Sequence, residues 1–161
     1  AFACRHPDVR RDRVARLVLV ATAAHGLAGG GRDRFWRIVL WRGWLNRLMT
    51  RPRLGRAFVR GTFGRAPRRA HVEATRALFV GTPPGVRRDC ALALGAMDLR
   101  DGLRAVDVPT VVLLGTRDQL IVNALTRAIV DHLAGARLHE LAGAGHMLPL
   151  ERPDEVVAAI V

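Results

Sequence analysis

An aspartate and a histidine in the second half of the sequence have the residue types and the setting of an acid and base pair. Asp118 follows the apolar run 108–114, and His146 follows the weaker run 137–142, each after a short glycine-containing turn. A carboxylate bonded to an imidazole fixes the tautomer of the ring and stabilises the imidazolium that forms during proton transfer. The two residues therefore predict a proton-transfer pair that serves a nucleophile.

Other acids and histidines are weaker candidates for this chemistry. Asp98 and Asp101 are rival acids, but they precede the run 108–114 rather than follow it. The remaining histidines have no comparable setting and are predicted to be surface or packing residues: His6, His25, His71, His132 and His139.

The elements that must position the pair alternate between strand and helix. The run 14–24 is short and almost continuously apolar, as is 108–114, which is typical of strands in a parallel sheet buried on both faces. Helical patterns at 124–133 and 154–161 flank a third strand at 137–142. This order predicts a partial parallel sheet with right-handed crossovers, in which polar residues after the strands share one edge.

The positive charge is concentrated in one segment. Residues 27–100 hold 16 arginines and four acids, whereas the rest of the chain holds ten of each. The composition changes at Gly29-Gly30-Gly31, and helical patterns follow at 34–49, 71–80 and 84–97 with no strand pattern between them. We expect 27–100 to be a basic helical cap inserted into a core formed by 1–26 and 101–161.

A basic cap has several interpretations. It is either a solvated helical face or a surface that steers anionic substrates or contacts anionic lipid. Nucleic acid binding is not expected, because no recognition motif accompanies the charge and the chain has no tyrosine for base stacking. The cluster of Trp36, Trp41 and Trp44 is either packing core or the lining of an acyl pocket.

Cysteine and histidine usage argues against a disulfide framework and against a metal site. Cys4 and Cys90 lack the number and spacing of either, and we expect both to be small buried apolar residues in a reducing cytoplasm. The apolar runs are too short to span a membrane. No metal or other cofactor is implied.

Taken together, these motifs resemble the α/β-hydrolase superfamily of capped esterases and other hydrolases, over almost the whole chain. The resemblance lies in VPTVVLLGTRD and in LHELAGAGHMLPLERPDEVVAAI, which look like the acid strand and the histidine loop with its closing helix. RHPDVRRDRVARLVLVATAA looks like the stretch just after the nucleophile. By resemblance, Asp118 is the triad acid and His146 the general base.

The nucleophile that such a triad needs is missing from the sequence. The chain has no serine, and the two glycine pairs with elbow spacing enclose Ala28 and Pro83. The candidate nucleophiles that remain are Cys4, Cys90 and threonines such as Thr22, and the sequence around them does not have the elbow pattern. The resemblance implies an elbow a few residues before Ala1, so that the segment from Ala1 to His6 would be the last turns of its helix, ended by Pro7. We therefore expect the C-terminal part of a hydrolase.

Three hypotheses about function follow. The first is a hydrolase that cleaves an ester or similar bond of a small apolar molecule, inactive as the chain stands because the nucleophile is absent. The second is a degenerate, non-catalytic relative that binds an anionic partner through its basic cap. The third is a fragment that folds poorly because one strand edge and part of a sheet face lie uncovered.

Overall fold

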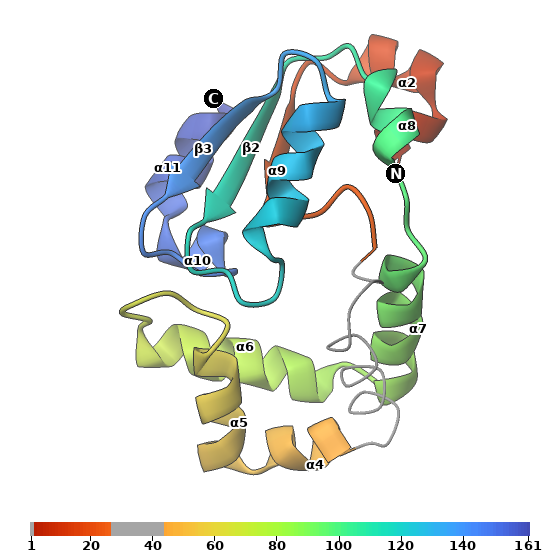
Figure 1. Ribbon diagram of the computed structural model, residues 1–161. Coiled ribbons are helices and arrows are strands. Elements are labelled where there is room, and N and C mark those ends of the chain that lie inside the picture. The colour runs from red at the N-terminus through yellow and green to blue at the C-terminus, as the bar shows by residue number, and fades with distance from the viewer. Residues whose placement is uncertain (1, 27–43) are drawn as a thin grey trace.

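In the computed structural model, residues 2–26 and 44–161 are described, and they form a parallel sheet with helices on both faces (Figure 1). The strands are β1 (Leu17–Val20), β2 (Thr110–Gly115) and β3 (Arg137–Leu141), in the spatial order β1-β2-β3. The predicted α/β class and parallel sheet are confirmed, and each strand lies within or next to its predicted run.

Burial differs between the strands because of their places in the sheet. The central strand β2 is buried at every residue except the half-buried Val111. The four residues of β1 are only half-buried, since β1 has a neighbour on one edge only among the described residues. The expectation that the run 14–24 is buried on both faces was therefore wrong for β1.

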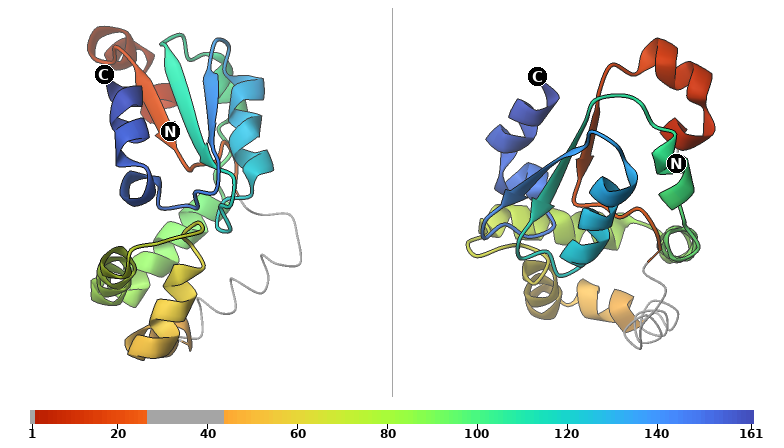
Figure 2. Two further views of the ribbon diagram at one scale, coloured as in Figure 1. Left: turned by 90° about the vertical axis from the view of Figure 1, so that its left-hand side faces the viewer. Right: turned by 45° about the horizontal axis from the view of Figure 1, so that its top comes forward.

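Helices lie on both faces of the sheet (Figure 2), and an apolar cluster holds them on each face. On one face, Ile129 of α9 (Asn123–His132) packs with Val112 of β2 and with Leu103 of α8 (Arg100–Arg104). Leu133, which follows α9, belongs to the same cluster. The other face carries α10 (Leu148–Glu151) and α11 (Pro153–Ile160), whose Leu148 and Val156 pack with Leu113 and Ala144. The sheet is thus the middle of three layers.

The N-terminal helices are α1 (Phe2–Arg5) and α2 (Pro7–Arg13). The first helix stops before Pro7 as expected, but a second one begins at Pro7, whose fixed φ suits the first turn of a helix. Arg10 of α2 is 2% exposed and donates hydrogen bonds to Asp107 and to the carbonyls of Ala3 and Ala105. This arginine anchors α2 beside the segment that leads into β2.

A separate group of helices lies beyond the carboxyl ends of the strands (Figure 1). We call it the helical layer, and its members are α4 (Trp44–Thr50), α5 (Pro52–Arg60), α6 (Arg69–Gly81) and α7 (Pro84–Gly95). Its buried core consists of Leu45, Met49, Val59, Phe63 and Val72. The predicted helices at 71–80 and 84–97 are confirmed, and α5 is a helix that the sequence analysis did not predict.

Several expectations fall on residues 27–43, outside the described ranges. They concern Trp36, Trp41, the Gly29-Gly30-Gly31 stretch and the first part of the helix at 34–49, of which α4 is the described part. The expectation for Cys90 was wrong, because Cys90 is exposed on α7, while Cys4 is half-buried. Within 2–26 and 44–161, no helix has the length and apolar character needed to cross a membrane.

Candidate active site

Asp118 lies in the turn after β2, and its side chain is almost completely buried, with 1% exposed. One carboxylate oxygen, Oδ1, accepts hydrogen bonds from the backbone N–H groups of Leu120, at 2.8 Å, and Ile121, at 2.9 Å. The other oxygen, Oδ2, lies 2.8 Å from Nδ1 of His146. A buried charge is tolerated where donors surround it in this way, so the turn holds the carboxylate in one orientation.

His146 lies in the loop that follows β3, and a quarter of its side chain is exposed. An ionised carboxylate can only accept hydrogen bonds, so the contact with Asp118 requires a proton on Nδ1. In the neutral ring, Nε2 then carries the free lone pair, and no described residue makes a hydrogen bond to it. The ring is therefore held in the tautomer that can take a proton at Nε2.

Close backbone packing joins the turn after β2 to the loop after β3. Thr116 Oγ1 accepts a hydrogen bond from the N–H of Gly143, and the N–H of Arg117 donates to the carbonyl of Ala144, at 2.9 and 2.8 Å. A Cβ at Gly115 would lie 2.1 Å from the carbonyl oxygen of Gly145, so a side chain has no room there. These contacts fix the separation of the two loops and hence of Asp118 and His146.

The rival acids lie elsewhere in the fold. Asp98 pairs with Arg100, whose guanidinium hydrogen bond holds the pKa of the Asp98 carboxyl well below its usual range. Asp101 pairs with Arg104 on α8 and is 95% exposed. Neither acid has a histidine ring in hydrogen-bond contact, in contrast to Asp118.

The other histidines make contacts of a different kind from that between His146 and Asp118. His6 packs on the ring of Phe2, and Nδ1 of His132 lies 2.7 Å from the carbonyl oxygen of Ala128 in its own helix. The backbone of His25 makes an isolated bridge to Asp98. In the described part of the chain, no three His, Cys, Asp or Glu side chains are grouped closely enough to hold a metal ion.

The residues weighed as nucleophiles do not form an elbow in the structure. Pro83 precedes α7 and cannot attack a carbonyl, and the glycine pair around Ala28 extends outside the described residues. Cys4 packs under Gly102, and the carbonyl of Thr22 accepts the hydroxyl hydrogen bond of Thr126. The described residues thus present an acid and a base together, without a nucleophile on an elbow.

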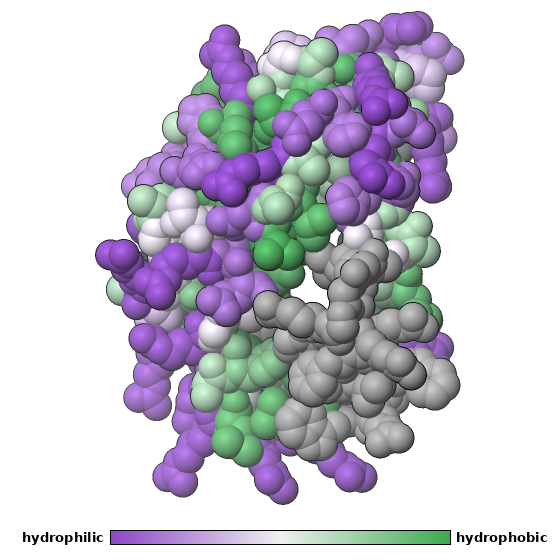
Figure 3. All heavy atoms as spheres, viewed as in Figure 1, coloured by the Kyte–Doolittle hydropathy of each residue, from purple (hydrophilic) through white to green (hydrophobic). Residues whose placement is uncertain are grey.

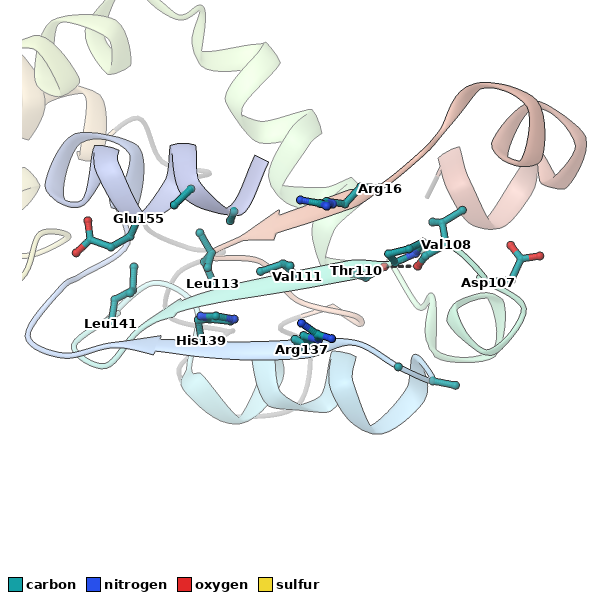
Figure 4. Close-up of a pocket in the computed structure, with 15 residues that line it drawn as sticks. Arg16, Asp107, Val108, Thr110, Val111, Leu113, Arg137, His139, Leu141 and Glu155 are labelled. Atoms are coloured by element: carbon teal, nitrogen blue, oxygen red, sulfur yellow. Dashed lines mark hydrogen bonds between the residues drawn. The ribbon is translucent and has the colours of Figure 1, made fainter. Parts of the chain in front are cut away.

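A large open groove lies on the α11 face of the sheet, and Figure 4 shows its lining. Its volume is about 760 Å³, and its walls come from β2, β3, α11 and the segment before β2. Neither Asp118 nor His146 is among the residues that line it. The groove is therefore a feature of the sheet face, separate from the candidate active site.

Sequence reasoning missed two residues that hold the histidine loop. The carbonyl of Thr62 accepts the backbone N–H of His146 at 2.8 Å, and the carboxylate of Glu151 accepts the N–H of Gly145. Thr62 is distant in sequence, and no local pattern marks it. Glu151 follows His146 by five residues, and only the wider GHMLPLERP context singles it out.

Comparison with known proteins establishes the family. The sequence model of the alpha/beta hydrolase family matches residues 1–159, so this chain belongs to that family. Over 60 residues the chain is 35% identical to the proline iminopeptidase of Lacticaseibacillus rhamnosus strain Lc 705, a match that covers 37% of this chain and 20% of that protein.

Solved structures agree with this assignment. The enol-lactonase from Burkholderia xenovorans LB400 is 26% identical, with a TM-score of 0.75, over 99% of this chain and 58% of its own. A hydrolase from Pseudomonas aeruginosa PA01 is 25% identical, also with a TM-score of 0.75, over 99% of this chain and 57% of its own. An esterase from Exiguobacterium antarcticum, 21% identical with a TM-score of 0.70 over 91% of this chain, shares the fold. The chain spans a little over half the length of these structures, 56% in the case of the esterase.

Proposed function

We propose that this chain supplies the acid and the general base of a hydrolase that cleaves an ester or similar bond in a small, mostly apolar molecule. The observation that carries the proposal is the 2.8 Å contact between His146 Nδ1 and the buried Oδ2 of Asp118, at the carboxyl ends of neighbouring strands. An esterase and an enol-lactonase among the similar structures favour an ester or lactone as the bond.

In the proposed reaction, Nε2 of His146 takes the proton of an attacking nucleophile and returns it to the leaving group. Asp118 remains ionised and stabilises the imidazolium, for which the two backbone donors at Oδ1 leave Oδ2 free. The chemistry needs no cofactor. None of the 161 residues is a serine, and the described loops hold no elbow, so we expect the chain alone to be inactive.

We further propose that residues 27–100 form a cap on a core made of 1–26 and 101–161. The helical layer lies beyond the carboxyl ends of the strands, and its Thr62 bonds to the backbone of His146. A cap in this place would shape the substrate site and exclude water from it. We also propose a cytoplasmic location, which suits the two free cysteines Cys4 and Cys90.

The first experiment is an assay of the purified chain on aryl esters beside a His146→Ala variant. We expect the two rates to be equal, because an acid and base pair without a nucleophile gives no covalent catalysis. Turnover by the unchanged chain that His146→Ala abolishes would contradict the absence of a nucleophile.

The second experiment is translation of the coding DNA on the 5′ side of the Ala1 codon. We expect a strand followed by a G-x-Ser-x-G elbow, and in the protein that carries it Asp118→Ala and His146→Ala should each lower kcat by about 10³-fold or more. An in-frame stop or an elbow with alanine in place of the nucleophile would overturn the proposed hydrolase.

A second candidate function is binding of an anionic partner through the helical layer. Seven exposed arginines there have no ion pair within the described residues, namely Arg47, Arg51, Arg53, Arg60, Arg65, Arg68 and Arg69. Figure 3 shows hydrophilic side chains projecting from the end of the molecule where α4 and α5 lie. Glu73 is the one acid between residues 44 and 88.

Binding to vesicles with and without anionic lipid, and to an acidic protein, tests this candidate. We expect affinity that falls steeply with salt and that is lost when Arg51, Arg53 and Arg60 become glutamine together. Equal binding to neutral vesicles, or binding unchanged by the triple substitution, would exclude it.

A further inference from the structure

A loop of the helical layer lies directly against the histidine loop. We call residues 62–65 the clamp loop and residues 143–146 the histidine loop. The N–H of His146 donates to the carbonyl of Thr62 at 2.8 Å, and the N–H of Arg65 donates to the carbonyl of Gly143 at 3.0 Å. Two backbone hydrogen bonds thus pair segments that are about eighty residues apart in sequence.

The carboxylate of Glu151, at the end of α10, bonds to both loops at once. Its Oε2 accepts the N–H of Gly64 at 2.7 Å, and the N–H of Gly145 lies 3.0 Å from Oε1 and 3.1 Å from Oε2. Hydrogen bonds to an ionised acceptor are stronger than those between neutral groups. One side chain therefore ties the clamp loop to the backbone N–H of Gly145, the residue immediately before His146.

Glycine is required where the two loops meet. A Cβ on Gly64 would lie 2.0 Å from the carbonyl oxygen of Gly143, and a Cβ on Gly145 would lie 2.5 Å from the carbonyl carbon of Phe63. Since real Cβ atoms do not come so close to backbone, neither loop can carry a side chain at this contact. The packing leaves the backbone of the histidine loop little freedom to shift.

The clamp loop is itself fixed to the helical layer. Phe63 is 4% exposed and belongs to the buried core of that layer, and Met147, next to His146, packs against the same core. Thr62 is also buried, and its hydroxyl donates to the carbonyl of Val59 in α5. The position of the histidine loop is therefore coupled to the helical layer as well as to the sheet.

From this geometry we infer that Glu151 is a positioning residue for His146. Its carboxylate clamps Gly145 to Gly64, so that the ring keeps its contact with Asp118 and Nε2 keeps one direction. The helical layer thereby takes part in orienting the base, and a ligand that displaces the layer would also move His146. The inference deepens the proposed function and rests on it, because it assigns His146 the part of general base.

Nuclear magnetic resonance on the full chain tests the inference without any need for activity. In the unchanged chain we expect slow amide exchange at Gly64 and Gly145 and a hydrogen-bonded Nδ1 proton on His146. In Glu151→Gln, which replaces one acceptor oxygen by a donor group, exchange at both amides should rise about tenfold, the change expected when one hydrogen bond is lost. The Nδ1 proton signal should broaden or shift at the same time.

Glu155→Gln is the matched control. Glu155 lies four residues further on, is about half exposed and forms an ion pair with Arg152. We expect this variant to leave the signals of Gly64, Gly145 and His146 unchanged. The same result from Glu151→Gln and Glu155→Gln would overturn the inference.

The outcomes separate the inference from the proposed function. If Glu151→Gln frees the two glycine amides but leaves the His146 ring signals unchanged, Glu151 only stabilises the loop and the inference fails. If the unchanged chain shows no hydrogen-bonded Nδ1 proton, the acid and base pair itself fails. Should Glu151→Gln not fold, Glu151→Asp decides, since it keeps the charge, shortens the side chain by one methylene and should give the same changes in smaller measure.

Discussion

At the residue scale, the two oxygens of Asp118 have separate tasks. Oδ1 accepts the N–H groups of Leu120 and Ile121, and Oδ2 is directed at His146. The turn therefore sets the orientation of the carboxylate before the histidine contributes anything. This division makes the tautomer of His146 depend on a single atom of Asp118.

Asp118→Asn tests that dependence. We expect the amide oxygen to keep the bonds to Leu120 and Ile121, so that the amide N–H₂ faces Nδ1 of His146. Nδ1 can accept a hydrogen bond from this group only if the proton of the neutral ring lies on Nε2. The tautomer of His146 should therefore change, as measured from its ring nitrogen shifts. The free energy of unfolding should fall by about 1–3 kcal/mol, because charge-assisted hydrogen bonds are replaced by neutral ones.

Asp101→Asn is the control for this substitution. Asp101 is exposed and forms an ion pair with Arg104, so the change should alter the free energy of unfolding by less than about 0.5 kcal/mol. It should also leave the His146 tautomer unchanged. A His146 ring that keeps its proton on Nδ1 in Asp118→Asn would contradict the pairing described for these residues.

At the element scale, the end of β2 and the histidine loop touch through backbone alone. Gly115 closes β2, and a Cβ there would lie 2.1 Å from the carbonyl oxygen of Gly145 and 2.7 Å from that of Ala144. Gly115→Ala should therefore push the loop away and lower the free energy of unfolding by about 1–3 kcal/mol, the usual cost of overpacking. Urea unfolding measures the change.

Gly85→Ala provides the comparison for this substitution. No atom of the described residues lies within 4 Å of a Cβ at Gly85 in the first turn of α7, so alanine should leave stability unchanged or raise it by up to about 1 kcal/mol. If both variants behaved alike, the close approach of β2 and the histidine loop would have no energetic weight.

The junction where the helical layer returns to the sheet depends on Asp98. Its carboxylate accepts the guanidinium of Arg100 and the backbone N–H of the same residue, and the N–H of Leu99 donates to the carbonyl of Ala24. The bond to Arg100 lowers the pKa of Asp98 in the folded chain. A lowered folded pKa stabilises the fold above the unfolded value of about 4, and this gain is lost as the pH falls through the folded pKa.

Asp98→Asn should therefore be less stable than the unchanged chain at pH 5–7, and the difference should shrink as the pH falls below about 4. Melting temperatures between pH 3 and pH 7 measure it. Asp89→Asn, which removes an exposed acid bonded to its neighbour Arg88, should show a smaller effect. A difference for Asp98→Asn that grows towards acidic pH would have the wrong sign for this explanation.

The helices and strands that could be predicted from the sequence differ from those that could not in the regularity of their apolar patterns. The strands and the helix α9 have regular apolar patterns, so their existence and order could be predicted from the residues alone. Helix α5 carries three arginines and a glycine over nine residues, which hides its apolar face, although Val59 is buried on it. Pro7 was predicted only to end a helix, because proline can stand just after one helix as well as in the first turn of the next.

For the candidate site, the sequence predicted the two side chains that a strand end presents, Asp118 and His146. It could not predict Thr62 or the clamping by Glu151, because both contacts depend on where the helical layer folds back. The distance between Oδ2 and Nδ1 also needed the structure. Local patterns thus point to the candidate acid and base, whereas the contacts made by Thr62 and Gly64 come from a segment that is distant in sequence.

At the scale of the whole molecule, the two faces of the sheet are covered by helices to different extents. On the face that carries α9, the apolar residues of β2 are buried, while the groove of about 760 Å³ opens beside α11 on the other face. Figure 4 shows Val111 and Leu141 in its floor and wall, with Arg16 and Arg137 along it. Asp107 and Glu155 also line it, so an amphipathic anion would place its apolar part in the hollow and its charge near Arg137.

This groove gives the last prediction, which concerns the uncovered sheet face. An apolar dye that carries a sulfonate should bind the folded chain and fluoresce, with its rings against Val111 and its charge near Arg137. Arg137→Glu should weaken the affinity by about fivefold, roughly the energy of one exposed ion pair, whereas Arg53→Glu on α5, far from the groove, should leave it unchanged. Fluorescence titration at low salt measures both. Equal weakening by the two substitutions would mean that net charge governs the binding, and the sheet face would then not be the exposed apolar surface of this chain.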